Sequence, residues 1–247
     1  MSSDITHLAL VLDAPMQSWG FESRFQRRTM GQHPTKSAVI GMISAAMGLA
    51  KGSPEEQATL PMLGELEMTS IVIPRVRTRP VSGETVELPV GRLDDFHTVL
   101  KTRRASGTMN PDPVVTRRQY LVDARFGVIL QGDHTLLKQV ANKLQDPVWG
   151  VWFGRKHCIP AAVVFVALSQ SQDEAWRGLL RVCGLNEGLP LETFTTVTEV
   201  KRFDQGTDSL ADQPVSFGDG EGSGQDKRRF AVRRIRVQPG VGLLGKE

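Results

Sequence analysis

The chain has 247 residues and is poor in cysteine and in long apolar runs. Its two cysteines, Cys158 and Cys183, cannot build a disulfide framework or a zinc cluster. No segment approaches the roughly 20 apolar residues that span a bilayer. The N-terminus carries Asp4 and has no basic stretch before its apolar residues, so we do not expect a signal peptide. These absences exclude a membrane protein, a secreted scaffold and a zinc-finger protein, and we expect a cytoplasmic location.

The residue patterns of familiar catalytic sites are also scarce. Segment 31–37 lacks the glycines and the spacing of a phosphate-binding loop. His157 and Cys158 are adjacent, so on an extended chain their side chains point apart and do not form a nucleophile–base pair. Asp94 and Asp95 are a lone carboxylate pair, whereas metal-dependent phosphoryl transfer usually needs further acids. The sequence therefore predicts neither a metal site nor a cofactor.

Basic residues are concentrated in three segments, although the net charge is only +3. Between Arg75 and Arg118, nine basic residues are opposed by five acids. Segments 24–36 and 227–236 contain four and six basic residues and no acid. Guanidinium groups bind phosphate oxygens in pairs, so three such clusters favour a phosphate-bearing partner over a set of solvated faces.

Hydrophobic periodicity predicts an α+β fold with the order β-α-β-β-α-β in residues 1–168. We interpret it as a modified ferredoxin-like (RRM-like) βαββαβ domain, with both helices on one sheet face and the other face free. The predicted elements, in chain order, are strand 7–13, helix 37–48, strand 66–73, strand 120–130, a helix capped by Asp133 and strand 161–168.

A long insertion and a C-terminal extension add to this domain. Residues 75–118 separate the second and third predicted strands, where a hairpin loop of about two to five residues would suffice. This segment is rich in arginine and has no sustained apolar period, so we expect a functional arm or a disordered segment. Residues 169–247 are predicted to form a β-containing extension, in which the acidic, glycine-rich residues 204–226 are a mobile loop.

Binding features are richer than catalytic ones. Gln17 and Trp19 follow the first strand, which places an amide and an aromatic ring at a sheet end. Lys36 stands at the start of the first helix, whose free N–H groups form an anion site by geometry. Gly154 precedes Arg155 and would let the backbone approach a phosphate closely.

Five motifs occur in one order along the chain, at Leu8–Gly20, Pro34–Gly48, Asp95–Leu100, Arg118–Phe126 and Gly154–Cys158. Together they resemble the CasD (Cas-five) family of subunits of the type I-E CRISPR complex Cascade. Each motif alone is weak evidence, whereas five in sequence are specific. The resemblance covers about residues 7–168 and does not extend to the C-terminal third.

The resemblance implies a non-catalytic subunit that binds the 5′ handle of the CRISPR RNA (crRNA) and caps the backbone filament in antiviral defence. In this family the arm, called the thumb, packs on a backbone subunit and helps displace a base near the handle–spacer junction. The large subunit and, indirectly, target DNA are further implied partners. We expect RNA contacts from Gln17, Trp19, Arg24, Arg28, Lys36, Ser37, His97, Arg103, Arg104, Arg117, Arg118, Arg155 and Lys156.

Two other functions stay open at this point. His97, with Lys101 or Tyr120, could form a metal-independent endoribonuclease site that processes CRISPR repeat RNA. In such a site a histidine acts as base or acid, and a cation stabilises the pentavalent phosphate. A small-molecule enzyme on a ferredoxin-like scaffold is the third alternative.

Overall fold

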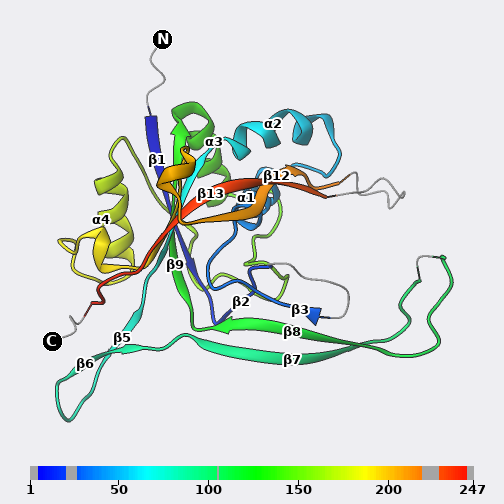
Figure 1. The fold of residues 1–247 in the computed structure, drawn as a ribbon, viewed down its shortest axis with the longest axis horizontal. Coiled ribbons are helices and arrows are strands. Elements are labelled where there is room, and N and C mark those ends of the chain that lie inside the picture. The colour runs from blue at the N-terminus through cyan, green and yellow to red at the C-terminus, as the bar shows by residue number, and fades with distance from the viewer. Residues whose placement is uncertain (1–4, 21–26, 105, 219–227, 244–247) are drawn as a thin grey trace.

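A seven-stranded antiparallel sheet forms the centre of the computed structural model, which describes residues 5–20, 27–104, 106–218 and 228–243 (Figure 1). The strands, in their order across the sheet, are β10 (Phe165–Ser169), β1 (Ile5–Asp13), β9 (Arg125–Asp133), β4 (Glu67–Val72), β11 (Thr196–Glu199), β13 (Arg229–Gln238) and β12 (Asp208–Ser216). The helices are α1 (Lys36–Met47), α2 (Pro54–Gly64), α3 (His134–Gln145) and α4 (Gln172–Val182), with short 3-10 turns η1 (Leu191–Thr193) and η2 (Phe203–Gln205).

Strand β1 is buried on both faces, which explains its unbroken apolar sequence. Leu8, Leu10 and Leu12 belong to the core under α1 and α3. Ala9 and Val11 point the other way, into a second core that includes α4. The prediction of a free sheet face is therefore wrong for β1, because α4 covers it.

Local capping explains where the helices begin and end. The Thr35 side chain accepts a hydrogen bond from the backbone N–H of Ala38 at the start of α1, and Gly48 ends that helix in a left-handed conformation. Asp133 caps α3 in the same way, as its sequence position predicts. At α4 the Ser171 side chain accepts a hydrogen bond from the backbone N–H of Glu174.

Between β4 and β9 the chain leaves the sheet and forms two hairpins. The first pairs β5 (Arg75–Thr78) with β6 (Thr85–Leu88), and the second pairs β7 (Gly91–Val99) with β8 (Val114–Val122) along their whole length. Figure 1 shows them projecting in opposite directions below the sheet. Two short strands, β2 (Met16–Gln17) and β3 (Arg27–Arg28), also pair with β8.

Asp123 divides what the alternating sequence predicts as one strand over 120–130. Its φ of 58° turns the chain between β8 and β9, which belong to different sheets. The prediction is wrong because polar–apolar alternation continues through the turn. Asp13 and Arg75 form an ion pair at this junction, and Arg75 Nε donates to the Asp123 carbonyl at 2.9 Å.

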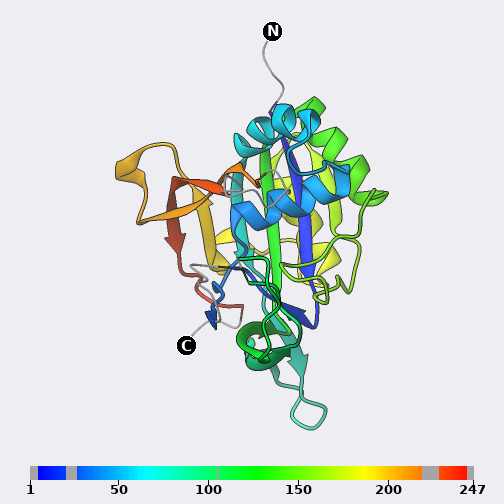
Figure 2. The same ribbon diagram turned by 90° about the vertical axis from the view of Figure 1, so that its right-hand side faces the viewer.

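The C-terminal segment extends the same sheet through β11, β13 and β12. Figure 2 shows this part at one side of the molecule, and α1 and α2 pack on β12. Residues 208–216 of the predicted mobile loop are strand β12, paired with β13, so the loop prediction is wrong there. Residues 219–227 lie outside the described residues. Within the described part, no helix is both long and apolar enough to cross a membrane.

Candidate nucleic-acid interface

Gln17 and Trp19 lie in the core rather than on a binding surface. Gln17 is 0% exposed, and its Nε2 donates to the carbonyls of Leu12 and Ala124 at 3.0 and 2.7 Å. Its Oε1 accepts from Trp19 Nε1 at 3.0 Å, and the Trp19 ring lies edge-on to Phe126. The prediction that these side chains meet RNA bases is wrong, because the fold already uses their polar and aromatic surface.

The start of α1 is occupied by carboxylates of the chain itself. Lys36 is 1% exposed, and its Nζ lies 2.8 Å from Glu199 Oε2. Its backbone N–H donates to Asp212 Oδ2 at 2.8 Å, and Asp212 also accepts two hydrogen bonds from Arg233. These four residues form the Lys36 network, which joins α1 to β11, β12 and β13. The prediction that Lys36 binds a phosphate is wrong, since Glu199 pairs with its ammonium group and Asp212 accepts its backbone N–H.

His33 borders the Lys36 network, and this position gives a pH prediction. Burial lowers the pKa of the His33 imidazole and outweighs its hydrogen bond to the Pro34 carbonyl, while Arg233 lowers the pKa further and Asp212 raises it. The unfolded chain therefore takes up this proton at a higher pH than the folded protein does. We predict that the free energy of unfolding falls as pH drops below about 6.5 toward the lower pKa of the folded state.

Thermal unfolding at about pH 7.5 and about pH 5.5 measures this effect. His33→Gln should reduce the difference in Tm between the two pH values. His97→Gln, a change at an exposed histidine of β7, should leave that difference as it is. An undiminished pH dependence in His33→Gln would contradict the assignment.

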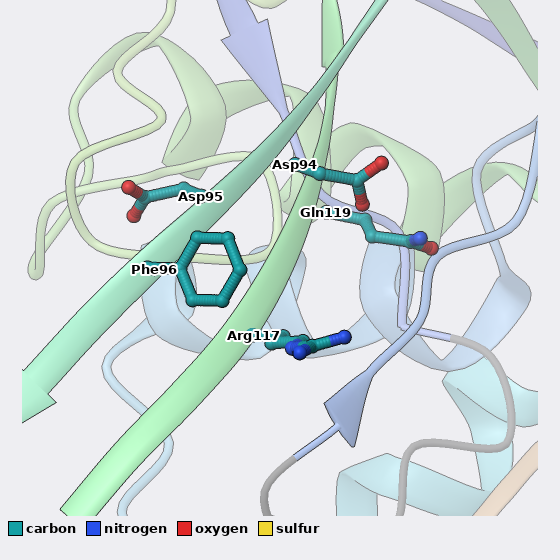
Figure 3. A pocket seen from close by; sticks show the side chains of 5 residues that line it. All are labelled: Asp94, Asp95, Phe96, Arg117 and Gln119. Carbon is teal, nitrogen blue, oxygen red and sulfur yellow. The ribbon is translucent and has the colours of Figure 1, made fainter.

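A hollow of about 210 Å³ lies on the β7–β8 hairpin (Figure 3). Phe96 and Arg117 are cross-strand partners there, and the guanidinium carbon lies 5.1 Å from the centre of the ring. Asp94 faces Gln119 in the same way, and Asp95 completes the lining. The hollow thus combines an exposed aromatic ring, a cation and hydrogen-bonding groups.

A cationic cluster forms where the loop after α3 meets β8. The Arg155 guanidinium carbon lies 4.5 Å from the centre of the Tyr120 ring, and the His157 ring lies 5.2 Å from it. Arg118 is on the same strand face as Tyr120, about 7 Å along β8. Lys156 is exposed on the same loop as Arg155, and its Nζ lies 5.9 Å from the centre of the Trp152 ring. The Tyr120 ring itself is buried. We call Arg118, Arg155, Lys156 and His157 the Tyr120 face, because they lie on the strand face of Tyr120 or on the loop that covers its ring.

Gly154 positions the loop that carries three of these residues. Its φ is +90°, and a Cβ at this position would lie only 1.7 Å from the carbonyl oxygen of Ser18. The Ser18 backbone N–H donates to the Phe153 carbonyl at 3.0 Å. The predicted close approach therefore exists, but the glycine approaches the backbone after β2 rather than a phosphate.

The residues of the alternative nuclease site are spread along the hairpin. His97 pairs with Thr116 and Tyr120 pairs with Leu93, so the two sites are four residues, or about 13 Å, apart. Lys101 lies beyond the end of β7, a further four residues along the chain. The structure does not bring these three side chains together. Among the described residues, no group of three or more His, Cys, Asp or Glu side chains could hold a metal ion.

The remaining predicted residues fall in several places. Arg103 and Arg104 are exposed near the tip of the β7–β8 hairpin, where Arg104 Nη2 donates to Asn110 Oδ1 at 3.1 Å. Ser37 is half-buried in the first turn of α1. Arg24 lies outside the described residues, so the prediction for it stays untested. The same holds for the side chain of Arg28, although its backbone belongs to β3.

His157 is a member of the Tyr120 face that the sequence analysis missed. Its position directly after Arg155 and Lys156 was an available signal. Burial raises the pKa of the Cys158 thiol, which fits a packing role for that residue.

A family model described as CRISPR-associated protein (Cas_Cas5) matches residues 7–236. The chain belongs to this Cas5 family. The match confirms the predicted family and extends beyond residue 168, where the sequence motifs that indicated it ended. The C-terminal strands are therefore part of what this Cas5 chain shares with its family.

Relatives of this Cas5 chain include the "CRISPR system Cascade subunit CasD" of Escherichia coli (strain K12). That protein is 27% identical over 172 residues, which cover 68% of this chain and 73% of the relative. A chain in a solved structure of a "CRISPR RNA-guided surveillance complex" matches with a TM-score of 0.68 and 28% identity, covering 95% of this chain and 90% of that one. A second structure, "Crystal structure of Cas protein", matches with a TM-score of 0.60 at 24% identity over 94% and 93% of the two chains, and supports the fold alone.

Proposed function

We propose that this Cas5 protein is a non-catalytic subunit of a type I-E-like Cascade complex that binds the 5′ handle of crRNA and caps the backbone filament. The observation that carries the proposal is the Tyr120 face, where Arg155 and His157 lie against one ring and Arg118 and Lys156 add positive charge at the base of the arm. Guanidinium groups held in place by ring contacts are suited to phosphate oxygens. The similarity to a CasD protein and to a chain of an RNA-guided surveillance complex supports crRNA as the RNA that this face binds.

The β7–β8 hairpin supports the proposed contact with a backbone subunit. It carries large apolar side chains that are at least two-fifths exposed, which is typical of a surface completed by a partner. They are Leu93, Phe96, Leu100, Met109 and Val115. We propose that this arm lies between crRNA and a protein neighbour, and that the large subunit and target DNA are reached through the assembled complex.

We also assign a ferredoxin-like arrangement to β1, α1, β4, β9, α3 and β10. The order β10-β1-β9-β4 and the antiparallel pairing of these neighbours support it. In this arrangement the arm is inserted where a short hairpin loop would otherwise join the second and third strands.

Arg155→Ala tests the proposed role of the Tyr120 face. The variant loses a cation held over Tyr120 but no buried side chain, so the protein should stay folded. We expect binding of handle RNA to weaken about tenfold and recovery of the assembled complex to fall accordingly. Arg177→Ala, which removes an exposed arginine of α4, is the matched control and should bind as the unchanged protein does. Fluorescence anisotropy and co-purification with a tagged chain measure the two effects.

Equal binding of handle RNA by the Arg155→Ala and Arg177→Ala proteins would refute the proposed site. The non-catalytic part of the proposal has a separate test. Repeat RNA incubated with the purified protein in EDTA should remain intact. Specific cleavage that disappears in His97→Ala would replace the proposal with the endoribonuclease function.

A further inference from the structure

Strand β13, which holds most of the basic segment of the C-terminal third, supplies a surface on a different sheet from the Tyr120 face. In β13, Arg233 and Ile235 are buried on one side, where Arg233 binds Asp212 and Ile235 packs with Val197 and Leu210. The alternation of a strand places Phe230, Val232, Arg234 and Arg236 on its opposite side, over a length of about 20 Å. Helix α4 packs chiefly on β1, β9 and β10. This side of β13 therefore remains accessible, and Val232 is 69% exposed.

Arg234 holds an aromatic ring beside this strand. Its three nitrogens donate to the carbonyl of Phe203 at 3.1 Å, to Ser209 Oγ at 3.1 Å and to the carbonyl of Gly206 at 2.6 Å. Its guanidinium carbon lies 4.2 Å from the centre of the Phe203 ring. A Cβ on Gly206 would lie 2.5 Å from the Arg234 side chain, so a larger residue there would force that side chain to shift.

The Phe203 ring is consequently fixed on one side and open on the other. It is 77% exposed although its loop is tied down by Arg234. An exposed aromatic ring that is already ordered loses little conformational entropy when another planar group stacks on it. A cation beneath the ring strengthens its position through the ring quadrupole.

Arg236 adds a phosphate-binding group next to the ring. Its Nε donates to the carbonyl of Gln205 at 2.8 Å, which orients the guanidinium group with its terminal nitrogens still suited to a phosphate. Two exposed acids lie nearby. Asp204 forms an ion pair with Arg202 at 2.8 Å, and Asp208 is opposite Ile235, so Arg229, Arg234 and Arg236 still outnumber the unpaired acid. Arg229 lies exposed at the start of β13. The surface therefore combines positive charge with an open ring.

We propose that Phe203, Phe230, Val232, Arg234 and Arg236, here called the C-terminal face, bind a single-stranded nucleic acid at a second site. Stacking of a base on an exposed ring beside guanidinium groups accommodates any sequence. The charge of the face complements a polyanion, which favours a nucleic acid over an apolar protein partner. This site is independent of the handle site proposed above, because the two faces share no residue.

The test uses the full chain and two labelled probes of about 12 nucleotides, oligothymidylate and oligouridylate. Binding is measured by fluorescence anisotropy in the unchanged protein and in an Arg155→Ala background, which removes the contribution of Arg155 at the Tyr120 face. Phe203→Ala should weaken binding about fivefold or more in both backgrounds, and Phe203→Trp should restore it. Arg236→Ala should weaken binding and make it less sensitive to salt. Arg177→Ala is the control for lost positive charge.

Tighter binding of one probe identifies the bound strand as DNA or as RNA. Equal binding indicates that the face recognises the phosphates and the base rings that both probes have in common. Unchanged affinity in Phe203→Ala and Arg236→Ala, in the Arg155→Ala background, overturns the proposal. Unchanged oligonucleotide binding together with loss of a protein subunit from the Phe203→Ala complex also overturns it, and assigns the face to a protein. Neither outcome affects the handle site, whose test is the Arg155→Ala protein alone.

Discussion

Asp212→Ala is expected to lower the free energy of unfolding by about 3–5 kcal/mol. Asp212 and Arg233 are each 5% exposed, and their two hydrogen bonds measure 2.6 and 3.0 Å. Removing the carboxylate leaves Arg233 buried beside Lys36, with only Glu199 to balance both charges. It also removes the acceptor of the Lys36 backbone N–H at the start of α1. Urea unfolding followed by circular dichroism measures the loss.

Three further variants separate this mechanism from general damage. Asp208→Ala changes an exposed acid of the same strand and should lower the free energy of unfolding only slightly. Asp212→Asn keeps an acceptor for the backbone N–H at the helix start. Its free energy of unfolding should therefore lie between those of the wild type and of Asp212→Ala. Asp212→Leu combined with Arg233→Met removes both charges and should recover much of the stability, since a buried ion pair can often be replaced by apolar side chains. A loss in the double variant as large as in Asp212→Ala would show that charge burial is not the cause.

Gly154→Ala should displace the loop that carries the Tyr120 face. The added methyl group would overlap the Ser18 carbonyl, and the φ of +90° is itself unfavourable for alanine. We expect a loss of at least about 2 kcal/mol of stability. Because Arg155 then leaves its place over Tyr120, binding of handle RNA should fall about tenfold or more. Thermal unfolding and anisotropy measure these two effects.

Gly107→Ala is the matched control for backbone strain. Its φ is +81°, but nothing lies within 4 Å of a Cβ built there. Gly107→Ala should therefore lose less stability than Gly154→Ala, because it meets only the unfavourable backbone conformation and no steric overlap. Hydrogen exchange at Ser18 and Cys158, whose backbone N–H groups donate to Phe153 and Arg155, should increase in Gly154→Ala alone. Equal effects of the two substitutions would refute the steric argument.

The sequence predicted the elements whose causes are local. Gly48 and Asp133 mark helix ends because a cap acts over three or four residues. The apolar run 7–13 indicated a central strand because both of its faces need apolar side chains. The turn at Asp123 was not predicted, because the residues on both sides of it keep the alternation of a single strand. Its positive φ is needed only because the chain passes there from one sheet to another.

The amino-acid sequence by itself determined the family, the arginine-rich arm and the basic C-terminal segment, since motifs and charge are properties of the chain. Only the tertiary structure decided which polar side chains are free to bind. Lys36 and Gln17 were expected at a surface, yet their partners Glu199 and Ala124 lie 163 and 107 residues away. Burial of a charge or an amide depends on such distant partners, because only the folded chain brings them within hydrogen-bond distance. The same folding brings Arg155 to Tyr120 and Arg234 to Phe203, and so creates the two faces proposed to bind nucleic acid.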